Sequence, residues 1–205
     1  MIKLIKIKAQ TLKNIINNSQ VINHDTLGKP KTLYSSDQNL IYKIYRKLSH
    51  RPFKKSPSRR TRRFIKNSLK FKSFGIYAPE VTAWLYCPKE KTYCIAYERL
   101  PGNTFKEYFA KHPSQELIKA LAKTVHTLHA KNIYFRAGHA DNYIYHDRKI
   151  GIIDIDNCRF YQHLNQRRKL KNLNYIREHA LENQYPLFND EQWQYFLDCY
   201  ATFRQ

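Results

Sequence analysis

The chain has 205 residues, a formal net charge of +21, and 42% hydrophobic and 14% aromatic residues. This apolar content is enough to bury a full core, as one domain or as two small lobes. No apolar run approaches the roughly 18 residues that a membrane-spanning helix needs, so we expect a cytoplasmic protein. The four cysteines show no metal-ligand spacing and indicate free thiols.

The first half of the chain has mainly strand patterns. Its start alternates Lys with Ile and Leu, which indicates a strand rather than the continuous apolar core of a signal peptide. Alternation of the same kind returns at residues 40–45 and 93–97. One basic helix is predicted near residues 59–73. Residues 1–97 are therefore expected to form a strand-rich N-terminal lobe.

Positive charge is concentrated in one segment of this half. Residues 43–72 contain thirteen Lys or Arg and no Asp or Glu, which favours an anionic partner. One candidate is an anionic membrane surface or a phosphorylated glycolipid within it, since each basic residue near such a surface contributes about 1 kcal/mol. The weaker alternative is nucleic acid, for which basic and aromatic residues would supply phosphate and stacking contacts. A third interpretation is a solvated basic loop.

Residues 98–205 predict mainly helices around one hairpin. After a potential N-cap at Ser114, apolar residues recur at a helical period. They are Leu117, Leu121, Val125 and Leu128. Further helices are predicted near residues 166–182 and 190–203. This half is therefore expected to form a short helical C-terminal lobe.

The stretch between these helices has the residue spacing of a kinase catalytic loop. Kinases use H-R-D-x-x-x-x-N, in which the Asp takes the substrate proton and the Asn holds a metal, and a later Asp binds Mg²⁺. Here Arg136 and Ala137 are followed by Asn142 and then by Asp154. A hairpin within residues 133–156 would bring the last two side chains to one Mg²⁺. The alternative is an ordinary helix and hairpin with solvated turns.

These residues resemble the lipopolysaccharide core kinases, the group of Kdo kinase, WaaP-type heptose kinases and InaA-like proteins. The resemblance lies in LHAKNIYFRAGHADNYIY and IIDID, and more weakly in IYKIY around Lys43, FGIYAPEV and YERLPGNTF. It covers residues from about 20 to about 180. It implies an α+β, compact two-lobed protein-kinase-like fold, with a small strand-rich N-lobe and a short helical C-lobe.

The resemblance also implies a reaction and a set of roles. It implies ATP- and Mg²⁺-dependent phosphorylation of a Kdo or heptose sugar in a lipopolysaccharide precursor at the inner membrane surface. We expect the chain to be a monomer. Asn142 and Asp154 would bind the metal. Lys43 would contact the nucleotide phosphates, and Glu98 would lie at the hinge beside adenine. Arg136 would occupy the kinase Arg position and orient the loop.

Three departures from the pattern put the reaction in doubt. Ala137 stands where the catalytic base should be. No Asp or Glu occurs in residues 38–79, so Lys43 would lack the acidic partner that kinases place on the following helix. The first 74 residues contain a single glycine, Gly28, and hence no glycine-rich phosphate loop. A turn is predicted at residues 28–31, in which Pro30 lacks a backbone donor.

Two residues on the same loop could replace the missing base. His139 and Asp141 both lie between Ala137 and Asn142, although each also suits a structural role in the loop. Loss of a general base costs about 10²–10⁴-fold in rate, so a slow enzyme remains compatible with Ala137. The alternative is a pseudokinase that binds nucleotide, anionic glycolipid or a partner protein without phosphate transfer.

Overall fold

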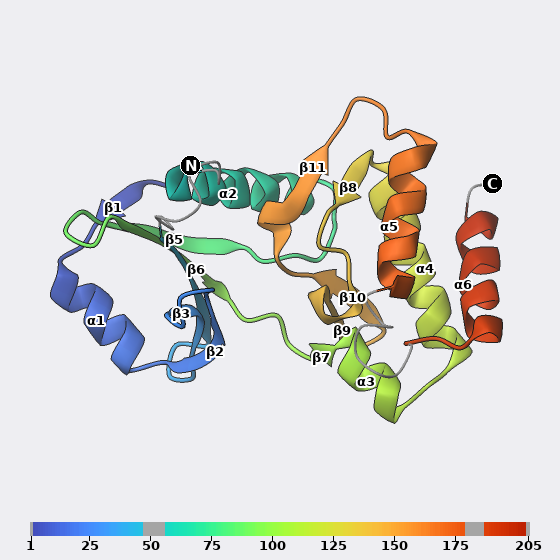
Figure 1. Ribbon diagram of the computed structural model, residues 1–205, viewed down its shortest axis with the longest axis horizontal. Coiled ribbons are helices and arrows are strands. Elements are labelled where there is room, and N and C mark those ends of the chain that lie inside the picture. Colours follow the sequence, from blue (N-terminus) through green and yellow to red (C-terminus); the bar gives the residue numbers. More distant parts are fainter. Residues whose placement is uncertain (1, 47–55, 179–186, 204–205) are drawn as a thin grey trace. The chain divides into compact units, whose positions relative to one another are not determined.

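The structure is a computed structural model that describes residues 2–46, 56–178 and 187–203 (Figure 1). The chain divides into two compact units, Met1–Arg99 and Leu100–Gln205. Among the described residues, none of the helices is both long enough and apolar enough to cross a membrane.

Unit 1 is built on a six-stranded sheet with the order β1-β5-β6-β4-β3-β2. Its strands are β1 (Leu4–Lys6), β2 (Gln20–His24), β3 (Pro30–Ser35), β4 (Leu40–Tyr45), β5 (Val81–Cys87) and β6 (Thr92–Glu98). Neighbouring strands are antiparallel except β1, which runs parallel to β5. Short turns join β2 to β3, β3 to β4 and β5 to β6, which accounts for their antiparallel pairing.

Two helices, α1 (Ala9–Asn17) and α2 (Pro57–Ser73), pack against this sheet. Alternating residues of β4 point to opposite faces, as in any strand. Tyr42 belongs to the apolar cluster that also contacts side chains of α1. Lys43 points to the other face, where its ammonium group lies near the Phe64 ring of α2. The predicted lysine is therefore on the α2 side of the sheet.

The N-terminal segment differs from the strand that its alternation predicts. Only Leu4–Lys6 forms a strand, and Ala9–Asn17 forms a helix. Leu12, Ile15 and Ile16 are spaced so that they share one face of a helix, and Leu12 is buried. The alternation of Lys with Ile just before this segment concealed the helical period.

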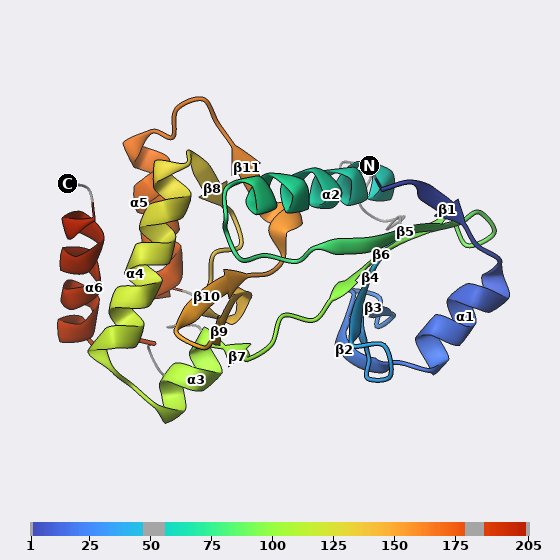
Figure 2. The same cartoon turned by 180° about the vertical axis from the view of Figure 1, so that it is seen from behind.

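Unit 2 combines helices with two small sheets, ordered β10-β9-β7 and β11-β8. Its strands are β7 (Asn103–Thr104), β8 (Ile133–Phe135), β9 (Tyr143–His146), β10 (Lys149–Ile152) and β11 (Cys158–Phe160). Its helices are α3 (Phe105–Lys111), α4 (Gln115–Ala130), α5 (Gln166–Glu178) and α6 (Asp190–Thr202), with 3-10 turns η1 (Ala140–Asn142) and η2 (Ile155–Asn157). Figures 1 and 2 show α4 and α6 side by side.

Helix α4 follows the sequence pattern closely. The Ser114 hydroxyl accepts a hydrogen bond from the Leu117 backbone N–H at 3.3 Å, which caps the helix. All four residues of the predicted apolar stripe are buried. Helices α5 and α6 lie where the other two were predicted, and the expected end of the first, residues 179–182, lies outside the described residues. Residues 47–55 of the basic segment lie outside them too.

Candidate active site

The hairpin of β9 and β10 brings the two predicted metal ligands close together. Its two-residue turn consists of Asp147 and Arg148, with φ of 47° and 58°, the backbone of a tight hairpin turn. Asn142 lies directly before β9, and its carbonyl oxygen accepts a hydrogen bond from the Ile153 N–H at 2.9 Å. Asp154 is the next residue and therefore lies beside Asn142.

Asp154 has a strained backbone that a neighbouring side chain stabilises. Its φ of 56° and ψ of 33° are left-handed, which costs a residue with a side chain roughly 1–2 kcal/mol. The Asn157 side-chain amide donates to Asp154 Oδ2, and the Asn157 backbone N–H donates to the Asp154 carbonyl at 3.0 Å. Strain of this kind concentrates at functional sites. Asn157 was not predicted, although its position three residues after Asp154 is typical of a local cap.

The Asn142 side chain is oriented by two hydrogen bonds and is largely buried. Its amide nitrogen donates to the Ala137 carbonyl at 2.7 Å and to His139 Nε2 at 2.8 Å. Because the nitrogen makes both bonds, Oδ1 is the atom that Asn142 can offer to a metal. An amide oxygen and a carboxylate are ligands that Mg²⁺ accepts, with phosphate oxygens or water completing the shell. The donor set at Asn142 and Asp154 therefore fits Mg²⁺.

The two predicted replacements for the base lie beside Asn142. His139 Nε2 accepts the Asn142 hydrogen bond, so its lone pair is engaged in this arrangement. His139 Nδ1 lies 3.4 Å from Asp141 Oδ2, and Asp141 Oδ1 lies 4.0 Å from Lys106 Nζ. The Asp141 side chain is 38% exposed and can be reached by solvent. A role for either residue as the base stays a prediction.

Asn172 of α5 holds the start of the catalytic loop. It is buried, it accepts a hydrogen bond from the Phe135 N–H at 3.0 Å, and its amide donates to the Phe135 carbonyl. Gly138 lies close by, and a Cβ added there would be 3.2 Å from the Asn172 amide nitrogen. No local pattern indicates this support, because Asn172 is 37 residues from Phe135 in the sequence.

Arg136 is exposed on this loop, and its backbone N–H donates to the Asn157 carbonyl at 3.3 Å. This bond joins the loop to the turn that carries Asp154. Burial and the nearby Arg136 charge both lower the pKa of Arg159. Two guanidinium groups therefore lie near each other beside the loop, although a role for Arg136 in orienting it stays a prediction.

Lys43, in unit 1, is buried among aromatic rings. Its ammonium nitrogen lies 5.5 Å from the centroid of the Phe64 ring and 5.8 Å from that of Tyr45. Phe64 belongs to α2, the helix after the lysine strand, where kinases place the acidic partner of this lysine. Rings at this distance attract a cation through their electron-rich faces. An aromatic ring thus contacts the lysine from the helix that supplies a carboxylate in kinases.

Glu98 ends β6, and its side chain is exposed. It belongs to unit 1 with Lys43, whereas Asn142 and Asp154 belong to unit 2. A nucleotide site that combines these four residues stays a prediction.

No protein-family model matches the chain, and no curated protein matches it either. Solved structures do match. An aminoglycoside-3'-phosphotransferase of type VIII is 13% identical with a TM-score of 0.66, over 90% of this chain and 86% of that one. The bifunctional kinase-methyltransferase WbdD is 16% identical with a TM-score of 0.54, over 83% of this chain.

The chain spans only 41% of the WbdD chain. At these identities the likeness concerns the fold. The predicted α+β protein-kinase-like fold is therefore confirmed.

Proposed function

We propose that this chain is a slow phosphotransferase that phosphorylates a Kdo or heptose hydroxyl of a lipopolysaccharide precursor. The observation that carries the proposal is the hairpin that holds Asn142 and Asp154 side by side in a kinase-type fold. The acceptor class is supported by the resemblance of residues 128–156 to the lipopolysaccharide core kinases.

In this proposal the residues of unit 2 hold a metal that neutralises phosphate charge, and they position the loop that meets the acceptor. Asn142 Oδ1 and the Asp154 carboxylate would hold Mg²⁺, which neutralises phosphate charge when ATP is bound. Asn157 orients the carboxylate, and Asn172 holds the loop that would meet the acceptor. Ala137 cannot take the acceptor proton, so we expect transfer about 10²–10⁴-fold slower than in a kinase with the base.

The second candidate is a pseudokinase that binds nucleotide or glycolipid without transferring phosphate. It is favoured by the packing of Lys43 against Phe64. Kinases place a carboxylate on the helix after the lysine strand, whereas α2 carries Phe64 near Lys43 and contains no Asp or Glu.

We further propose that the exposed face of α2 binds an anionic membrane surface or a phosphorylated glycolipid. Arg59, Arg62 and Lys66 are exposed and share one face of the helix, which contains no Asp or Glu. Leu69, one turn further on, is 51% exposed, and Phe74 after the helix is 37% exposed. Basic side chains beside exposed apolar ones suit a lipid surface. Nucleic acid remains the weaker alternative.

The phosphotransfer proposal is tested with radiolabelled ATP, Mg²⁺ and Kdo-lipid A-type acceptors. We expect slow transfer by the natural chain and by Asp147→Asn, a control in the exposed turn of the same hairpin. Asp154→Asn should abolish transfer. ATP binding without transfer would favour the pseudokinase, and no binding at millimolar ATP would exclude the enzyme.

The membrane proposal is tested by sedimentation with vesicles of phosphatidylglycerol or phosphatidylcholine. Replacement of Arg59, Arg62 and Lys66 by Gln should remove binding to the anionic vesicles. The matched control replaces three exposed lysines of unit 2 by Gln, namely Lys111, Lys119 and Lys123. Equal loss in both triple variants would contradict a role specific to α2. Salt-sensitive binding to single-stranded RNA, with none to vesicles, would favour nucleic acid.

A further inference from the structure

The turn between β2 and β3 lies where the kinase fold places its phosphate loop. β2 and β3 precede the strand that carries Lys43, and α2 follows that strand. In kinases a glycine-rich loop in this position covers the nucleotide phosphates. The turn here runs from Asp25 to Lys29, and not from residue 28 to 31 as predicted, because Pro30 already belongs to β3.

The backbone donors of this turn are taken by the carboxylate of Asp25. Asp25 Oδ1 accepts from the Leu27 N–H at 2.9 Å and from the Lys29 N–H at 3.1 Å. The Gly28 N–H donates to the Asp25 carbonyl at 3.0 Å, and the φ of 70° at Gly28 is one that glycine adopts without strain. Two N–H groups therefore converge on one anionic oxygen.

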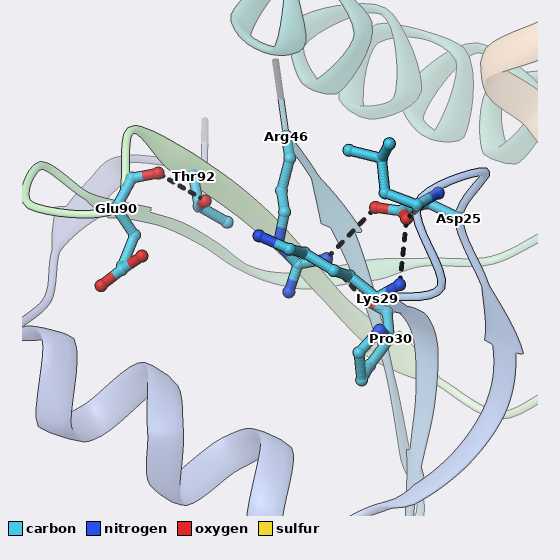
Figure 3. Close-up of polar contacts among 7 residues, drawn as sticks. Asp25, Lys29, Pro30, Arg46, Glu90 and Thr92 are labelled. Atoms are coloured by element: carbon cyan, nitrogen blue, oxygen red, sulfur yellow. Dashed lines mark hydrogen bonds and ion pairs between the residues drawn. The ribbon is translucent and has the colours of Figure 1, made fainter. Parts of the chain in front are cut away.

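Arg46, at the end of β4, contacts the same carboxylate. Its Nη1 lies 3.7 Å from Asp25 Oδ2 and donates to the Pro30 carbonyl at 2.5 Å. Figure 3 shows Arg46 reaching the turn, with Lys29 and Pro30 beside Asp25. The Arg46 and Asp25 side chains are only 18% and 12% exposed. Backbone N–H groups and a guanidinium are the donors that proteins use for phosphate.

The charges of this cluster agree with its geometry. Partial burial acts to raise the pKa of Asp25, but the Leu27 and Lys29 N–H groups and the Arg46 charge outweigh it and lower the pKa. Burial lowers the pKa of Arg46. The charge of Asp25 opposes this decrease most strongly, and Cys94 and Glu90 oppose it less. Asp25 is therefore ionised at neutral pH.

We infer that the Asp25 carboxylate is a built-in anion that fills a phosphate-type site and keeps nucleotide phosphates out of this turn. The inference rests on the proposed function and deepens it, because it states which part of the nucleotide site the chain has closed. Without Asp25, the Leu27 and Lys29 N–H groups and the Arg46 guanidinium would be available to a di- or triphosphate.

The test compares the natural chain with Asp25→Ala by calorimetric titration with inorganic tripolyphosphate and with ATP. Asp25→Ala should bind both at least about tenfold more tightly, since hydrogen bonds to a charged group are worth this much. The matched control is Asp37→Ala, which removes an exposed Asp between β3 and β4 with the same change in net charge. The double variant Asp25→Ala/Arg46→Gln should lose most of the gain.

Unchanged affinity in Asp25→Ala, or an equal gain in Asp37→Ala, would overturn the inference. If Asp25→Ala does not fold, Asp25→Asn decides, because its amide oxygen can still accept from the turn while its charge is gone. A gain in phosphate affinity by Asp25→Asn that is smaller than the gain expected for Asp25→Ala supports the inference. No gain by Asp25→Asn overturns it. If Asp25→Ala binds tripolyphosphate more tightly but neither the natural chain nor any variant transfers phosphate, the inference stands and only the proposed phosphotransfer is refuted.

Discussion

The predicted metal ligands of unit 2 and the predicted nucleotide contacts of unit 1 have different surroundings. Asn142 and Asp154 are oriented by hydrogen bonds with the Ala137 carbonyl and the Asn157 side chain. In unit 1, Phe64 contacts Lys43, and Asp25 fills the turn that would cover phosphates. Hydrogen bonds thus orient the candidate ligands of unit 2, whereas an aromatic ring and a carboxylate contact the candidate nucleotide-binding groups of unit 1.

Asn142 and Asp154 also have a structural role within unit 2. The Asn142 side chain donates to the Ala137 carbonyl within the loop, and Asp154, directly before η2, accepts a hydrogen bond from the Asn157 side chain. Each residue therefore supports the local fold whether or not a metal binds.

The largest effect is expected in unit 1, at the ring that contacts Lys43. Phe64→Ala should lower the free energy of unfolding by about 3–5 kcal/mol, because a fully buried ring is lost together with its stacking on Tyr97. Phe74→Ala, at a ring that is 37% exposed, is the control and should cost much less. Urea unfolding measures both. Similar losses would show that Phe64 is not part of the core.

A similar loss in the free energy of unfolding is expected in unit 2, at Asn172. Asn172→Ala should cost about 2–5 kcal/mol, because it removes the side-chain acceptor of the buried Phe135 N–H and one of the two donors to the Phe135 carbonyl, which keeps the Gly138 N–H. Asn174→Ala, at an exposed position of the same helix, should stay within about 0.5 kcal/mol of the natural chain. Thermal and urea unfolding provide the measurement. A mild Asn172→Ala variant would mean that the loop does not depend on α5.

The third prediction concerns the contribution of Lys43 to ATP affinity. Lys43→Met keeps the length of the side chain and removes its charge. Because Lys43 packs against Phe64 and Tyr45, we expect the Kd for ATP to change less than about twofold. Isothermal titration measures it. Weakening of tenfold or more would place Lys43 at the phosphates, as the sequence predicts.

The smallest effect concerns pH. The folded pKa of Asp25 lies below its ordinary value of 3.8, so its stabilisation is present above that value and is lost as pH falls through the folded pKa. Asp25→Asn removes this dependence. The stability gap between the two proteins should therefore narrow as pH falls below about 4. Urea midpoints over that range measure it, and a constant gap would mean that the Asp25 charge does not stabilise the turn.

Local patterns predicted much of the fold, including α4 and the hairpin of β9 and β10. The Ser114 cap and the apolar stripe locate α4, and counting from Ala137 to Asn142 and Asp154 locates the hairpin. In these cases neighbours in the sequence determine the structure.

Contacts between distant residues could not be predicted. Asn172 meets Phe135 across 37 positions, and Phe64 meets Lys43 only once α2 packs on the sheet. Asp25 was not predicted, because its hydrogen bonds to the Leu27 and Lys29 N–H groups place the turn earlier in the chain than Gly28 and Pro30 indicate.

The most direct test of the proposed metal site at Asn142 and Asp154 is to measure Mn²⁺ binding by electron paramagnetic resonance. Mn²⁺ prefers the same oxygen ligands as Mg²⁺. We expect the natural chain and Asp147→Asn to bind Mn²⁺ alike, and Asp154→Asn to bind it at least about tenfold more weakly. Equal Mn²⁺ binding by the natural chain and Asp154→Asn would contradict a metal site at Asn142 and Asp154.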